Sequence, residues 1–186
     1  MSLPRLLRDE RGVSALEFAL ILPLLVLLSV GTIDVSRLVL ITQKVQSAAF
    51  TLADLTARIS TAKSTTLGNE FLAINQVMKP FDFDGEGNAI ISIVSSPTAA
   101  NTPLVALQCK GSGGYAATSS IGVVSHTATL PSGFDIGKGE TVVAAEVYFD
   151  FEPLFGIGLL SSRVIRRAAF FKPRLGELDS LTCAST

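Results

Sequence analysis

The feature that most constrains this chain is a long apolar run near its N-terminus, from Val13 to Ile33. Its 21 residues would form a helix about 31 Å long at ~1.5 Å per residue, which matches the ~30 Å hydrocarbon core of a bilayer. The run therefore predicts a transmembrane helix. The net charge of the chain is −1, which gives no electrostatic reason to expect nucleic acid as a partner.

The segment before the run, MSLPRLLRDERG, carries three arginines: Arg5, Arg8 and Arg11. The positive-inside rule counts arginines and largely ignores acids, so we expect the N-terminus to stay in the cytoplasm. Polar helix-forming sequence follows the run directly, without the small-residue cleavage site of a secretory signal. The span is thus expected to remain in the mature protein, with a kink at Pro23 that a bilayer tolerates.

One acid, Glu17, lies inside the apolar run. An acid at the centre of a span costs about 2.5–3.5 kcal/mol and suggests a functional partner. Glu17 is near the end of the span, where a side chain can also reach the interface at little cost. Two interpretations are open: an interfacial acid, or an acid paired with a charge from another chain.

The residues from Gly12 to Phe18, followed by the apolar run, resemble the class III leader of type IV pilin-like proteins. The longer stretch RDERGVSALEFALILPLL resembles TadE-like and TadG-like proteins, the minor pilins or pseudopilins of the tight-adherence (Tad, Flp) pilus system. The resemblance implies that a prepilin peptidase cuts after Gly12 and leaves Val13 as the new N-terminus. It also implies that Glu17, which precedes the aromatic Phe18, neutralises the Val13 amine of a neighbouring subunit.

Two later stretches, EVYFDFEPLFG and FFKPR, resemble the C-terminal part of TadE-like proteins less specifically. Together the two matches imply a minor pilin or pseudopilin that acts in assembly or priming of a Tad pilus. They imply anchoring in the inner membrane with a periplasmic C-terminal domain. The implied partners are other pilins, the prepilin peptidase and the Tad inner-membrane platform.

The sequence after the span continues the helix. It lacks proline from Gly31 to Ser60, and Asp34 and Arg37 are spaced to form an exposed pair on the helix. Apolar residues recur there at steps of three and four: Leu38, Ile41, Val45, Ala48, Leu52, Leu55 and Ile59. This narrow seam predicts packing on the chain's own domain, and it also suits bundling with other pilin helices.

The sequence as a whole predicts an α+β fold. A long transmembrane and stalk helix comes first, and a small domain follows, in which an antiparallel sheet packs on helix. We expect a leader at 1–12, the helix at 13–60 and the domain at 61–186. A second helix should end near Lys79, and QCKGSGGYAATSS should be a loop. The expected strands are Ala89–Ser95, Ile121–Leu130, Thr141–Phe151 and Arg166–Lys172. Within Thr141–Phe151, alternation predicts one apolar face, which meets the helix, and one largely acidic face.

Cys109 and Cys183 are the two cysteines, too few for a zinc site. If the domain is exported to an oxidising compartment, they form one possible disulfide. The alternative is two free thiols.

Other motifs give no support for an enzyme, a cofactor or a metal. DFDGEGNAI, residues 82–90, imitates a calcium loop, but its twelfth position is Ile93 instead of glutamate, so we expect a polar turn. The glycines around Lys138 lack the spacing of a phosphate-binding loop. His126, the single histidine, is expected on a strand face without a catalytic partner.

Two rivals to the pilin interpretation stay open. In the first, the chain is never cleaved and the helix is a permanent signal anchor. In the second, the helix tethers a periplasmic binding or adhesion module whose domain recognises a ligand.

Overall fold

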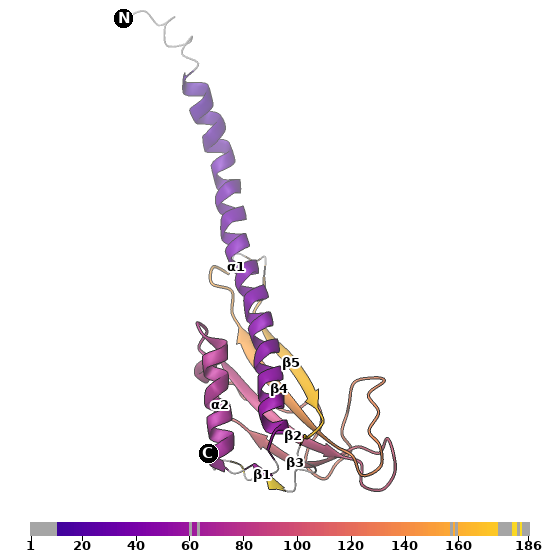
Figure 1. Cartoon of the computed structure of the whole chain (residues 1–186). Helices are drawn as coiled ribbons and strands as arrows, with labels where there is room; N and C mark the ends of the chain where they lie inside the picture. Colours follow the sequence, from indigo (N-terminus) through magenta and orange to yellow (C-terminus); the bar gives the residue numbers. More distant parts are fainter. Residues whose placement is uncertain are drawn as a thin grey trace, which may run out of the picture. The chain divides into compact units, whose positions relative to one another are not determined.

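The computed structural model describes residues 11–59, 61–62, 64–156, 158, 160–174, 180–181 and 183 (Figure 1). The predicted leader lies outside them except for Arg11 and Gly12. The helices are α1 (Arg11–Ala57), α2 (Ser64–Met78) and α3 (Phe83–Glu86). The strands are β1 (Thr61–Ala62), β2 (Gly87–Ser95), β3 (Leu104–Lys110), β4 (Thr141–Phe151), β5 (Arg163–Phe171) and β6 (Ser180–Leu181).

Contacts divide the chain into two units. One holds the residues up to Val39 together with Glu152–Ser161, and the other holds Leu40–Phe151 and Ser162–Thr186. The sequence places a boundary after residue 60, whereas contacts group the C-terminal part of α1 with the sheet.

Helix α1 runs without a break through Pro23 to Ala57, so the apolar run and the polar stretch after it form one helix, as predicted. Residues 12–29 are all exposed. From Ile41 onward one face is buried, and Ile41, Val45, Ala48 and Leu52 are at most 1% exposed. Ala49 and Ala53 are also fully buried, so this face is broader than the predicted seam. The seam residues from Ile41 to Leu52 pack on their own domain, whereas Leu38, Leu55 and Ile59 are only partly buried.

The main sheet is antiparallel, with strand order β3-β2-β4-β5. β4 has the predicted bounds, β2 and β5 differ from the predicted strands by a few residues, and α2 ends at Met78, near the predicted end. Phe50 of α1 packs edge-on against Phe171 of β5, and Phe81 packs likewise against Phe149 of β4. The apolar face of the sheet therefore meets the helical side of the domain, and the α+β prediction is confirmed (Figure 1).

The predicted strand Ile121–Leu130 is wrong. This segment is a loop whose one described bridge pairs Thr127 with Leu104. Positive φ angles at Gly122 (136°) and Ser125 (67°) interrupt an extended backbone. Ile121 and Ala128 instead pack with Val94 and Val142, so the β-branched composition reflects burial against the sheet and not strand pairing.

Strand β3 overlaps the segment QCKGSGGYAATSS, which the sequence predicts to be a loop. Strand β3 ends with Gln108, Cys109 and Lys110, and it pairs with β2.

Both faces of β4 are covered, because residues 142–149 are all buried. The part of the expected acidic face that holds Glu146 is thus interior, with Glu146 fully buried, whereas Asp150 is half-buried and Glu152 is exposed beyond the strand.

Candidate functional site

The residues expected to carry pilus function lie in the exposed N-terminal part of α1. Val13 is 55% and Phe18 59% exposed, and Gly12 and Glu17 are exposed as well. Val13 and Glu17 are four positions apart, so they share one face of the helix. Within the described chain, Glu17 has no hydrogen-bond or ion-pair partner, which leaves its carboxylate available to another molecule.

The polar side chains later in the span bond to the helix itself. Ser29 Oγ donates to Leu25 O, and Thr32 Oγ1 donates to Leu28 O, each at 2.8 Å. A bilayer requires this internal satisfaction, because lipid tails offer no hydrogen-bond partner. The surface of this segment is therefore compatible with lipid, apart from Glu17.

Asp34 does not form the expected exposed pair with Arg37. It is 2% exposed, and its Oδ1 accepts a hydrogen bond of 2.8 Å from the backbone N–H of Leu154. This contact joins two segments of the first unit that are 120 residues apart in sequence.

A buried polar cluster surrounds Glu146 on β4. Its Oε1 accepts from Arg166 Nε at 2.9 Å and Nη2 at 2.6 Å, and from the Tyr148 hydroxyl at 2.9 Å. The backbone N–H of Ser120 donates to the same oxygen at 3.1 Å, and Ser119 Oγ donates to Oε2. The carboxylate therefore joins the loop at 119–120 to two strands of the sheet.

The surroundings of this cluster identify it as structural. Burial raises the pKa of Tyr148, and the nearby Glu146 charge acts in the same direction. Tyr148 stacks on Tyr115 with ring centroids 6.2 Å apart. The carboxylate bonds to both the guanidinium and the phenol, which explains how a charged side chain is accommodated inside the sheet. Sequence reasoning missed it, although Glu146 amid apolar strand residues was a signal.

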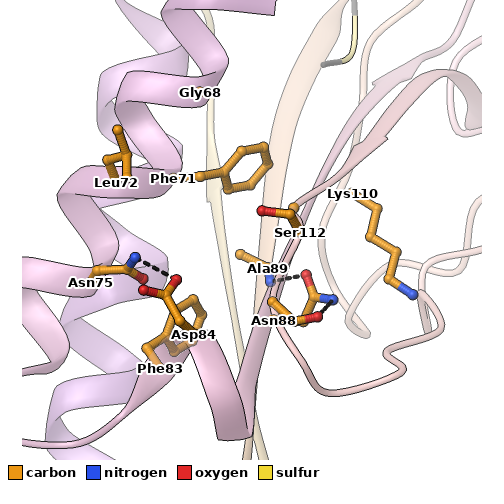
Figure 2. A pocket seen from close by; sticks show the side chains of 12 residues that line it. Gly68, Phe71, Leu72, Asn75, Phe83, Asp84, Asn88, Ala89, Lys110 and Ser112 are labelled. Atoms are coloured by element: carbon orange, nitrogen blue, oxygen red, sulfur yellow. Dashed lines mark hydrogen bonds between the residues drawn. The ribbon is translucent and has the colours of Figure 1, made fainter. Parts of the chain in front are cut away.

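A cavity of about 200 Å³ lies between α2, α3 and β2 (Figure 2). Asn75 Nδ2 donates to Asp84 Oδ1 at 2.6 Å, and the two side chains face each other in Figure 2. Asn88 Nδ2 donates to the carbonyls of Gly113 and Tyr115 at 2.9 and 2.8 Å. Most of the polar side chains lining the cavity are thus already paired within the protein.

The glycines beside this cavity have a packing role. A Cβ at Gly113 would lie 2.1 Å from the carbonyl oxygen of Gly87, and one at Gly114 would lie 2.2 Å from that of Gly85. Only glycine permits such a close backbone approach. The glycine-rich loop is therefore explained without a ligand.

The motifs that were weighed as metal or catalytic sites have other positions in the structure. Asp82 caps α3, and its Oδ1 accepts from Gly85 N at 3.2 Å. The calcium-like segment, residues 82–90, is thus one helical turn followed by the start of β2. His126 is exposed in the loop with Nδ1 3.1 Å from Val124 O, so its placement on a strand face is wrong. Lys138 precedes the turn glycine Gly139, whose φ is +75°.

Cys109 and Cys183 are joined as a disulfide, with their Cα atoms 5.3 Å apart. Cys109 is the buried end, at 2% exposure on β3, and Cys183 follows β6. The bond links the C-terminal segment to an edge of the main sheet.

Replacing both cysteines with serine is expected to lower the free energy of unfolding by about 2 kcal/mol, the low end for a disulfide. The reason is that β6 lies outside the four-stranded sheet, so losing the bond frees a short segment and not the core. Urea denaturation of the two proteins in the same detergent measures the difference. Recovery of both cysteines as free thiols from exported wild-type protein, by peptide mapping without reductant, would contradict the pairing.

The fold and the N-terminal segment together define a class: an α+β protein whose described residues include one helix long and apolar enough to cross a membrane. Residues 12–54 match the family model described as TadE-like protein. This match confirms the N-terminal resemblance and indicates a protein associated with the Tad pilus, whereas the resemblance of EVYFDFEPLFG and FFKPR lies outside the matched residues and stays a prediction. No curated protein and no solved structure matches the chain.

Proposed function

We propose that the chain is a minor pilin or pseudopilin that assembles or primes a Tad pilus. A prepilin peptidase removes the leader after Gly12, the helix holds the product in the inner membrane, and the α+β domain is displayed in the periplasm. The role is structural and not enzymatic. The other pilins and the assembly platform contact it through α1.

The observation that carries this proposal is that α1 has an exposed first part and a later part that is buried on one face. Residues 12–29 contact nothing that buries them, although large apolar side chains such as Leu20 (74% exposed) dominate their surface. The later part of the helix, from Ile41, buries one face in its own domain. The first part is therefore free for lipid and neighbouring helices, and the family match covers it.

The orientation follows from the charges around the span. Arg5, Arg8 and Arg11 precede the apolar run, and basic residues favour the cytoplasmic side. The prepilin peptidase would meet Gly12 on that side, and the disulfide would form on the other, oxidising side.

Replacing Gly12 with leucine is expected to leave the leader attached. A Cβ at Gly12 meets no atom within 4 Å, so the substitution does not disturb the helix, and a change in processing reports recognition by the peptidase. Mass spectrometry of the N-terminus in the native host should find Val13 first in wild-type protein and residues 1–12 retained in the variant.

The matched control is Ala15→Leu, which adds a similar side chain three residues later and should mature normally. If Gly12→Leu also matures at Val13, or if the wild-type chain keeps its leader, the processing proposal is wrong. The second outcome would favour a permanent signal anchor.

The alternative is an uncleaved, membrane-tethered binding or adhesion module. The cavity between α2, α3 and β2 is the observation in its favour. Its internally paired polar groups argue for the pilin role instead. A chain that keeps the helix but lacks the domain would separate the two functions, because only a binding module loses all activity with the domain.

A further inference from the structure

The segment Glu152–Ser161, which connects β4 to β5, is largely apolar in sequence. Its sequence is EPLFGIGLLS. Leu154 is 61% and Phe155 48% exposed, and Gly156 follows with φ of +56°. Exposed apolar side chains that extend a larger apolar surface mark sites of contact with protein or membrane.

Contacts group this segment with the N-terminal part of α1, not with the sheet. The bond from Leu154 N–H to Asp34 Oδ1 (2.8 Å) holds the segment against the helix. Figure 1 shows the connection between β4 and β5 beside α1. Asp34 directly follows Ile33, the last residue of the apolar run. The two exposed side chains are thus held at the level where the span ends.

Asp34 explains why this arrangement suits a membrane boundary. A carboxylate next to hydrocarbon is costly unless it is hydrogen-bonded or screened. Here the segment supplies an N–H donor and Asp34 is only 2% exposed. The neighbouring Ile33 and Val35 stay 45% and 47% exposed, so the surface next to the covered acid is still apolar.

We infer that Glu152–Ser161 is a membrane-contacting loop, which inserts Leu154 and Phe155 into the lipid interface beside the end of the span. The occupant of this apolar surface is lipid and not a second protein, because the loop continues the exposed apolar surface of α1 at the depth of Ile33. The inference rests on the proposed anchoring of α1 in a membrane. It adds a second contact with the bilayer, distant in sequence from the first.

The chain has no tryptophan, so a single tryptophan can report depth. The full chain with Phe155→Trp is reconstituted in phosphatidylcholine vesicles that contain lipid with a doxyl quencher either high or low on the acyl chain. We expect blue-shifted emission and stronger quenching by the shallow doxyl group than by the deep one. Leu24→Trp, in the middle of the span, should be quenched more by the deep group.

Val123→Trp is the matched control, because Val123 is 52% exposed in a loop of the other unit; it should be quenched by aqueous iodide and not by lipid. Quenching of Leu24→Trp without lipid quenching of Phe155→Trp would overturn the loop inference and leave the anchor intact. Failure of Leu24→Trp to be quenched would contradict the anchor itself. The tryptophan of Phe155→Trp could instead be shielded from aqueous iodide only at high protein density, with the shielding lost as protein is diluted into excess lipid. That result would identify a second copy as the occupant and would also overturn the inference.

The Asp34 contact gives an independent readout. In the Phe155→Trp protein, Asp34→Asn keeps an oxygen acceptor and should retain lipid quenching, whereas Asp34→Ala should reduce it. Equal quenching in both variants would show that this hydrogen bond does not hold the loop in place.

Discussion

We expect Glu146→Gln to lower the free energy of unfolding by about 3 kcal/mol, the low end of the cost of breaking a buried ion pair. The substitution keeps the shape of the side chain but removes the charge that faces Arg166 and accepts from Tyr148 and Ser120. The low end applies because the Arg166 side chain is 38% exposed and can regain some hydration. Urea denaturation of the full chain in mild detergent measures the change. Near-ultraviolet circular dichroism of the stacked Tyr115 and Tyr148 reports this region directly.

Glu70→Gln is the matched control, because Glu70 is another buried acid of the same unit, at 6% exposure. Burial raises the pKa of Glu70, and the Thr56 hydroxyl 2.8 Å away partly offsets this. A raised pKa means that charging Glu70 costs stability as pH rises through the folded pKa. Glu70→Gln should therefore be at least as stable as wild type at pH 7, and this advantage should vanish at acidic pH. Equal losses in the two variants would contradict the structural importance of the Glu146 cluster.

Glu17→Ala is expected to abolish most association between α1 helices in the membrane while leaving insertion and cleavage largely intact. The substitution removes a group that is costly in lipid, so the free energy of membrane insertion becomes more favourable. The amine at Val13 then lacks a counter-charge, and such a pair is much stronger in a low-dielectric medium than in water. Crosslinking between span positions in membranes measures association, and N-terminal sequencing measures cleavage.

Glu17→Asp retains the charge and should retain part of the crosslinking, whereas Glu17→Gln should behave like the alanine variant. Because Val13 and Glu17 share a helix face, Glu17 could also pair with the amine of its own chain. In that case Glu17→Ala would change no crosslink, and Glu17 would be an interfacial acid without a role in assembly.

The elements that local patterns define were predictable. The seam of α1 and the bounds of β4 follow from patterns that can be counted along the chain. The alternation in β4 did not predict its burial, because residues 142–149 are buried on both faces. The disulfide was one of two open possibilities. Residues 121–130 misled the prediction because β-branched residues favour burial in loops as well as in strands, and here Ile121 covers the sheet. β3 was missed because Gln108 and Lys110 lead directly into a glycine-rich loop.

The polar contacts could not be predicted, because each depends on distant parts of the chain. Glu146 meets Arg166 and Ser119, which are 20 and 27 residues away. Asp34 accepts from a backbone N–H, which has no signature in the sequence. The spacing of Asp34 and Arg37 on the helix suggested a local pair. The fold shows that Asp34 accepts from the backbone N–H of Leu154 instead.

The disulfide between Cys109 and Cys183 has a consequence for how the chain withstands proteolysis. The chain it encloses includes residues 111–139, the long connection in which the described residues form a single bridge and no strand. Exposed connections of this kind are where proteases cut first. A cut there leaves both fragments covalently joined, with β2, β3, β4 and β5 still able to pair. The protein can therefore be cut within residues 111–139 and stay one molecule until a reductant reaches it.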